Sequence, residues 1–194
     1  MRLHRAPTVT ALLLAATLTL AACSDDEPRE PEPSPTSTGT TAAPTPSPSA
    51  EPTEPVLPEA AKEPTEAGAR AFITYYWDLI NYAQVTGDVK ALEKASGPNC
   101  AGCNAGITGI RERYAGGSRV VGGEHTVEIQ SVTLLTSSSR TTRAFRAEMT
   151  ARHGEQTVVD SDGSQDERGA GQDQFTVYIL WVGARWRLDV MEIK

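Results

Sequence analysis

The sequence has fewer cationic than acidic residues, few cysteines and one long apolar run. Its 194 residues include 18 Lys and Arg against 25 Asp and Glu, for a formal charge of −7. This balance argues against nucleic-acid binding and against an electrostatic attachment to anionic lipid, because both need clustered Lys and Arg. The sequence also lacks a glycine-rich phosphate loop and a nucleophile elbow, which excludes two common catalytic motifs.

The one long apolar run lies near the start of the chain, from Val9 to Leu20. It is too short to span a bilayer, which takes about 20 residues. Arg2 and Arg5 precede it, and small residues follow it directly. A basic head, a short apolar core and a small-residue cleavage site predict a secretory signal over residues 1–22. No second long apolar run occurs, so the sequence predicts no transmembrane helix.

The end of this signal, Leu20-Ala21-Ala22-Cys23, resembles the lipobox of bacterial lipoproteins, whose cysteine sulfur receives a diacylglycerol before cleavage. The resemblance implies that Cys23 is the lipid attachment residue. It also implies an extracellular head that is held at the outer face of the cytoplasmic membrane by acyl chains such as palmitate. Two acyl chains suffice for stable anchoring. The alternative is an ordinary secretory signal followed by a cysteine by chance.

Residues 23–64 form a segment of different composition, dominated by Pro, Thr, Ser, Ala and Glu and without Phe, Trp or Tyr. Because such a segment cannot bury enough apolar surface to fold, we predict a disordered tether that lifts the head off the membrane. The composition is also typical of O-glycosylated stalks. All eleven aromatic residues fall between Phe72 and Trp186, so we expect one globular domain over residues 65–194.

Apolar residues at helical spacing predict three helices in the first half of this domain. The first covers residues 66–85, with Thr65 at its start and Gly87 at its end. A short second helix follows Asp88 as its N-cap, and the third covers residues 101–114.

The period then changes to 2, which is typical of strands. We expect strands near residues 127–134, 145–151, 157–159, 175–181 and 186–190, with a polar loop over residues 165–173. A change of parity predicts a bulge near Gln130-Ser131. Helices first and a meander afterwards indicate an α+β fold, with three helices packed on one face of a curved antiparallel sheet.

Several residues of the folded part are characteristic in combination. They are Phe72, Tyr75-Tyr76-Trp77, Asn81-Tyr82-Ala83, Thr86-Gly87-Asp88, Cys100-x-x-Cys103, Tyr114 and Gly122-Gly123. With them, residues 69–194 resemble an uncharacterised family of actinobacterial lipoproteins, the domain of unknown function 6318. The order of elements resembles the cone-shaped nuclear-transport-factor-two-like, or cystatin-like, fold. The family has no assigned activity, so the resemblance implies a location and a fold.

Cys100 and Cys103 form a C-x-x-C motif in front of the third predicted helix. In an exported, disulfide-permissive compartment we favour a structural disulfide between them. A redox pair is an alternative, because a helix N-terminus lowers the pKa of a thiol. Zinc is a third, but it needs four ligands and no second C-x-x-C occurs. We therefore predict no metal and no cofactor.

Two further patterns were weighed as sites. Residues 160–167 are acidic, but Gly163 comes fourth rather than sixth, which favours a solvated hairpin turn over a calcium loop. Acid–base groups for an enzyme on the cone fold are also present, but no spacing connects them, and we assign no catalytic residue. These groups are Tyr76, Asp78, His125, Glu148, His153 and Asp189.

A ligand pocket between helix and sheet is the last hypothesis, because cone folds often keep one and Tyr and Trp bring polar ends to it. We expect a non-catalytic module that binds an envelope protein or a small ligand, and no nucleic acid. An enzyme of the cone-fold type is the alternative, and the open sheet is the expected surface for a protein partner or a homodimer. The candidate lining residues are Phe72, Tyr76, Leu79 and Trp181, with Tyr75, Trp77 and Tyr82 as further aromatic candidates.

Overall fold

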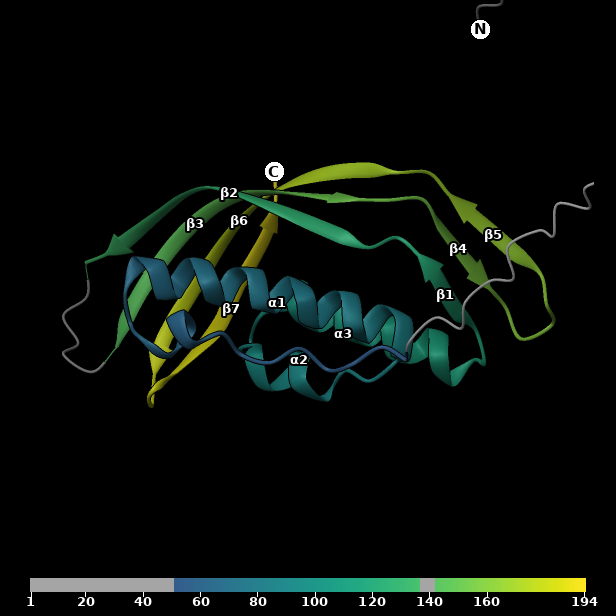
Figure 1. Ribbon diagram of the computed structural model, residues 1–194, viewed down its shortest axis with the longest axis horizontal. Coiled ribbons are helices and arrows are strands. Elements are labelled where there is room, and N and C mark those ends of the chain that lie inside the picture. The colour runs from purple at the N-terminus through teal and green to yellow at the C-terminus, as the bar shows by residue number, and fades with distance from the viewer. Residues whose placement is uncertain (1–50, 137–141) are drawn as a thin grey trace, which may run out of the picture. The chain divides into compact units, whose positions relative to one another are not determined.

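The computed structural model describes residues 51–136 and 142–194 (Figure 1). The predicted signal peptide, Cys23 and most of the predicted tether lie outside the described residues. Within the described ranges, three α-helices come first and seven strands follow. This order confirms the predicted α+β fold, with helices on antiparallel strands, the arrangement expected of the nuclear-transport-factor-two-like fold. None of the described helices is both long and apolar enough to cross a membrane.

The helices occupy the first part of the described chain and the strands the second. They are η1 (Glu59–Lys62, a 3-10 helix), α1 (Glu66–Thr86), α2 (Lys90–Ala95), α3 (Ala101–Ala115), β1 (Arg119–Gly122), β2 (His125–Leu135), β3 (Arg143–His153), β4 (Gln156–Val159), β5 (Gln165–Arg168), β6 (Gly171–Val182) and β7 (Arg185–Ile193).

Helix α1 begins and ends close to the predicted residues. The Thr65 hydroxyl accepts the Gly68 N–H at 3.0 Å and so satisfies a free donor of the first turn. Gly87 ends the helix with a φ of +76°, a left-handed conformation that favours glycine. A Cβ at Gly87 would also lie 2.6 Å from the Tyr114 ring. The buried residues of α1 are Gly68, Ala69, Phe72, Ile73, Tyr76, Trp77, Leu79 and Ala83.

The two shorter helices follow the predicted order with one shift. Val89, and not Asp88, occupies the N-cap of α2, although Asp88 Oδ1 still accepts the Lys90 N–H at 3.0 Å. The predicted residue, Asp88, therefore still accepts a backbone N–H of the first turn of α2, although it lies one position before the N-cap. Helix α3 begins directly after Cys100, as predicted.

Four long strands form an antiparallel sheet in the order β2-β3-β6-β7. One face of this sheet is apolar and shares a core with the buried face of α1. The predicted bulge is confirmed, because the register of β2 against β3 shifts between Ile129 and Ser131. The core residues that alternate along the strands are Phe145, Ala147, Met149, Val177, Ile179 and Leu188.

Three short strands form a second antiparallel sheet in the order β1-β4-β5. No predicted strand covers β1, and the predicted polar loop over residues 165–173 is wrong, because β5 and the start of β6 lie there. Every residue of β5 is exposed, so this strand has no apolar alternation that a sequence pattern could reveal. Pairing with β4 creates it instead.

The two sheets are joined at a bend where three passages of the chain cross from one sheet to the other (Figure 1). Each crossing contains glycine: Gly122-Gly123, Gly154 and Gly169. Gly122 and Gly123 have φ values of +73° and +74°, which other residues rarely adopt. Because the crossings are in register, His125, His153 and Gly171 lie side by side at the bend.

The packed part of the chain starts before the predicted domain boundary at residue 65. Leu57 packs against the core, and Ala61, in η1, is completely buried. We call residues 54–62 the N-terminal strap. The strap falls within the predicted tether, because isolated apolar residues among Pro and Glu carry no periodic signal. The structure differs here, since the helices and sheet supply the apolar surface that the strap itself lacks.

Candidate functional site

A pocket of about 460 Å³ opens between the strap, α1, α2 and the turn that joins β6 to β7. Its volume lies within the range of about 300–1,000 Å³ that is usual for small-molecule sites. Aromatic rings, alanines and a few charged groups form its walls. The lining residues are Glu54, Leu57, Ala61, Lys62, Phe72, Tyr75, Ala91, Lys94, Ala95, Trp181, Ala184, Arg185 and Trp186.

Stacked aromatic rings make up the deep wall of this pocket. Phe72 and Trp186 are 2% and 4% exposed, and their rings stack with centroids 6.0 Å apart. Trp181 meets Trp186 edge-on at 5.2 Å, since the two residues pair directly across β6 and β7. Such ring–ring contacts stabilise the positions of the side chains beyond the effect of burying their apolar surface. The wall is therefore rigid and preformed.

Small side chains leave the space that the aromatic rings do not fill. Ala91 and Ala95 lie one turn apart on α2, so both face the pocket together with Lys94. Ala61 faces it from the strap. A larger residue at Ala91 would enter the pocket directly, which makes this position suitable for a test.

The β6–β7 turn positions one side of the pocket through an unusual backbone. Gly183 and Ala184 have φ values of +60° and +58°. Positive φ at both central residues suits a tight hairpin turn, and it brings Trp181 opposite Trp186. Ala184 is the non-glycine residue with positive φ in the described part of the chain, so this turn carries some backbone strain.

Cations outnumber acids around the pocket. Lys62, Lys94 and Arg185 contribute to the lining, against one carboxylate, that of Glu54. Burial raises the pKa of the Tyr75 phenol, and the nearby charge of Glu54 raises it further. The lining therefore has a net positive charge in a chain whose formal charge is −7.

The predicted lining residues divide into two groups. Phe72 and Trp181 line the pocket, as does Tyr75. Tyr76 and Leu79 are each 1% exposed and belong to the core instead. The Tyr76 hydroxyl bonds to Ser96 Oγ at 2.8 Å, and burial raises the pKa of this phenol to about 12.

Trp77 and Tyr82 also lie outside this lining, and Trp186 was missed. The alternation of Trp186 with Leu188 and Val190 indicated a buried face for this ring, but no sequence signal showed that part of it borders a pocket.

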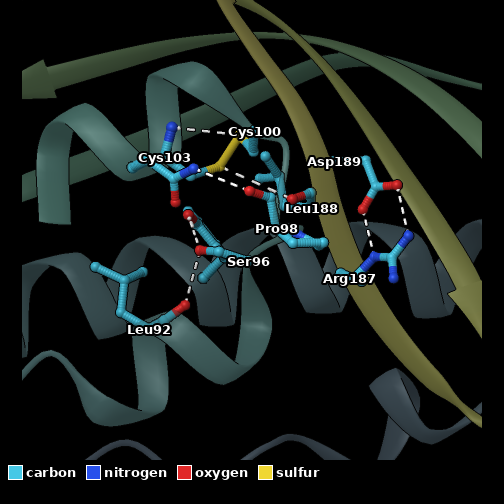
Figure 2. A network of polar contacts seen from close by, with 10 residues as sticks. Leu92, Ser96, Pro98, Cys100, Cys103, Arg187, Leu188 and Asp189 are labelled. Atoms are coloured by element: carbon cyan, nitrogen blue, oxygen red, sulfur yellow. Dashed lines mark hydrogen bonds and ion pairs between the residues drawn. A yellow bond between two sulfur atoms is a disulfide. The ribbon is translucent and has the colours of Figure 1, made fainter.

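Cys100 and Cys103 are joined by a disulfide, which confirms the predicted pairing (Figure 2). Both residues are buried, and Cys100 Sγ accepts the Cys103 N–H at 3.3 Å. Cys103 Sγ lies 3.8 Å from the Leu188 carbonyl oxygen, a packing contact, since a disulfide sulfur carries no hydrogen. The Gly97 N–H donates to the same carbonyl at 2.7 Å. The bridge thus helps to fix the α2–α3 connection on β7, a structural role.

A second polar cluster lies at the bend, around the rings of His125 and His153, whose centroids are 5.6 Å apart. The Gln84 amide nitrogen lies 3.0 Å from His125 Nδ1, and the Gln156 amide donates to Gln84 Oε1 at 2.8 Å. Asn81 bonds to both the N–H and the C=O of His125. A cavity of about 260 Å³ adjoins this cluster, lined by Asn81, Gln84, Val85, Gly122, Gly123 and Glu124.

The electrostatics of the bend favour a neutral His125. Burial lowers its pKa below the ordinary 6.5, the charge of His153 lowers it further, and Asp173 opposes both effects. The Gln84 amide nitrogen, which can only donate, favours a free lone pair on Nδ1 and so acts in the same direction. The His125 ring is therefore protonated only at a lower pH than an ordinary histidine.

The six acid–base candidates from the sequence do not form one site. His125 and His153 meet at the bend, and the Asp78 carboxyl nearby has its pKa raised by burial and by Glu124. Among the described residues, no group of three or more His, Cys, Asp or Glu side chains is arranged to hold a metal ion. Tyr76 lies in the core, Glu148 pairs with Arg146 and Lys194, and Asp189 pairs with Arg187.

Comparison with known families adds a family assignment. A family model matches residues 41–192, and its description is a family of unknown function, DUF6318. The chain belongs to this family. The match begins inside the predicted tether, so the DUF6318 region includes the strap as well as the helices and strands. No curated protein matches the chain.

Several solved structures are similar to this DUF6318 protein at low sequence identity. The intermembrane space region of the chloroplast protein ARC6 is 13% identical with a TM-score of 0.50, over 68% of this chain and 97% of that one. A periplasmic fragment of TraM is 10% identical with a TM-score of 0.43, over 68% and 98%. Aln2 from Streptomyces is 13% identical with a TM-score of 0.37, over 72% and 91%. The first likeness shows a shared fold.

Proposed function

We propose that this DUF6318 protein is a lipid-anchored lipoprotein whose head binds a small ligand without catalysis, at the outer face of the cytoplasmic membrane. The order of basic residues, apolar run, small residues and Cys23 supports the anchor. The pocket under the strap supports the binding role. An envelope lipoprotein with a preformed pocket is suited to capture a molecule near the membrane.

One observation carries the binding role: a pocket of about 460 Å³ that is walled by fixed aromatic rings and small side chains. Apolar walls with a few polar groups are typical of sites that recognise small molecules. The two histidines lie at the bend, outside this lining. The groups around the pocket therefore suit recognition better than proton transfer.

A filling substitution tests the pocket. Ala91→Phe should place a ring in the space that a ligand would occupy, and Ala105→Phe, at an exposed position of α3, is the matched control. The full chain is purified gently from its own host and weighed by native mass spectrometry. We expect a bound small molecule on the wild type and on the control, and its loss in Ala91→Phe. A bound mass that Ala91→Phe retains would place the ligand elsewhere and contradict the proposal.

A second experiment tests the anchor. Cys23→Ala removes the sulfur that would be acylated. We expect loss of labelled palmitate and either release from the membrane fraction or an unprocessed precursor, because a plain chain lacks the two acyl groups that give stable binding. A Cys23→Ala variant that stays membrane-bound at its mature size would disprove lipidation at this residue.

A further inference from the structure

The pocket contains cations that have no salt bridge within the described residues. Fourteen Lys and Arg side chains lie in the described part of the chain, and nine of them form salt bridges. Lys94 and Arg185 are among the five that do not, and both line the pocket. Lys62, the third cation of the lining, pairs with Glu59. The lining therefore includes two exposed cations that form no salt bridge within the described residues.

These charges lie at a pocket whose remaining lining is mainly apolar, with Lys62 and the Glu54 carboxylate as its other charged groups. Phe72, Trp181 and Trp186 provide flat rings, and Ala91 and Ala95 provide space beside them. Lys94 lies three residues after Ala91 on α2, so the two side chains share a helix face, and Arg185 lines the pocket from the start of β7. An aromatic surface next to unpaired cations matches a molecule with an apolar ring system and an anionic group.

We propose that the pocket takes an amphipathic aromatic anion, with its ring system against the tryptophans and its carboxylate, sulfonate or phosphate group at Lys94 and Arg185. This inference rests on the proposed binding function and adds the chemical class of the ligand. Charge-assisted hydrogen bonds to these side chains supply the preference for an anion, because bonds to charged groups are stronger than neutral ones.

A pair of fluorescent probes tests the inference. Anilinonaphthalene sulfonate carries an aromatic body and an anionic group, and N-phenylnaphthylamine has nearly the same body without the charge. Both are titrated against residues 23–194 carrying Cys23→Ser, a chain that lacks both the predicted signal peptide and the proposed acylation site and therefore needs no detergent. We expect the sulfonate to bind at least about tenfold more tightly than the neutral probe. The preference should shrink with added salt.

Charge variants locate the preference. The double variant Lys94→Gln, Arg185→Gln should weaken the sulfonate about tenfold or more and leave the neutral probe unchanged. Lys90→Gln removes a charge from the same helix outside the pocket, and it should change neither affinity. Equal binding of both probes, or a double variant that behaves like wild type, would overturn the inference.

The Ala91→Phe variant separates this inference from the proposed function. Loss of both probes in Ala91→Phe, together with equal binding of both by wild type, keeps the pocket and overturns only the anion preference. Retention of both probes in Ala91→Phe overturns the pocket itself, and the inference with it. Near-ultraviolet circular dichroism confirms folding in each case, because the sulfonate probe also binds partly folded chains. Ala91→Leu replaces Ala91→Phe where the larger ring prevents folding.

Discussion

The two halves of helix α1 contribute to two different polar environments. The first half, with Phe72 and Tyr75, borders a pocket of about 460 Å³ where Lys94 and Arg185 have no salt bridge among the described residues. The second half reaches the bend, where Asn81 and Gln84 bond to His125 and so hold the start of β2. At the bend the polar groups bond to each other and maintain the fold, whereas at the pocket Lys94 and Arg185 are exposed and accessible to a ligand.

The cavity at the bend and the pocket under the strap also differ in size and lining. The bend cavity has a volume of about 260 Å³ and is lined mainly by amide, glycine and carboxylate groups. The strap pocket is larger and lined mainly by rings and alanines. Size and apolar lining together favour the strap pocket as the ligand site.

The largest expected effect comes from removing one buried tryptophan at the strap pocket, Trp186, and one near the bend, Trp77. Trp186→Ala and Trp77→Ala should each lower the free energy of unfolding by about 3–5 kcal/mol, because both rings are buried and packed on other rings. Urea unfolding measures the loss. Only Trp186→Ala should also abolish binding of the sulfonate probe. Probe binding that both variants lose equally, with both still folded, would break the distinction between the two ends.

The disulfide should have an intermediate effect. Replacing Cys100 and Cys103 together by alanine should lower the free energy of unfolding by about 2 kcal/mol, since the bridge closes only a short loop. Urea unfolding of the double variant and of the wild type, both without reductant, gives the difference. Unchanged stability would show that packing on Leu188, and not the cross-link, fixes the α2–α3 connection.

Acid should reduce the contribution of His125, at the bend, to the stability of the fold. The pKa of His125 is lower in the folded chain than the ordinary 6.5, so the unfolded chain binds more protons between these two values. The contribution of His125 to stability is therefore complete above pH 6.5 and falls as the pH drops toward the folded pKa. In urea unfolding at a series of pH values, His125→Gln should flatten this slope. A slope that stays the same would assign the effect to other groups.

The smallest expected effect is a gain at the strap end. Ala184→Gly should raise the free energy of unfolding by about 0.5 kcal/mol, because the left-handed strain of alanine exceeds the entropy cost of glycine. Ala170→Gly, at an exposed position without positive φ, is the control and should bring no gain. Thermal unfolding compares the two variants, and a loss of stability in Ala184→Gly would remove the argument for strain in this turn.

The sequence by itself determined the elements whose signals are local. Thr65 and Gly87 marked the ends of α1 through a hydroxyl acceptor and a left-handed φ, and both depend on the residue itself. The parity change near Gln130 marked the bulge in the same way. Phe72 and Trp181, which line the pocket, were also among the predicted lining residues, but that prediction came from the resemblance to cone folds, which often keep a pocket between helix and sheet.

Only the tertiary structure decided which of these residues meet. Phe72, Tyr76 and Leu79 share a buried helix face, yet only Phe72 also borders the pocket, because the strap, α2 and the β6–β7 turn form its other walls. The strap and β5 carry no periodic pattern, and each is ordered by a partner distant in sequence. The pocket is formed in this way, since its walls come from four separate segments whose proximity no local pattern encodes.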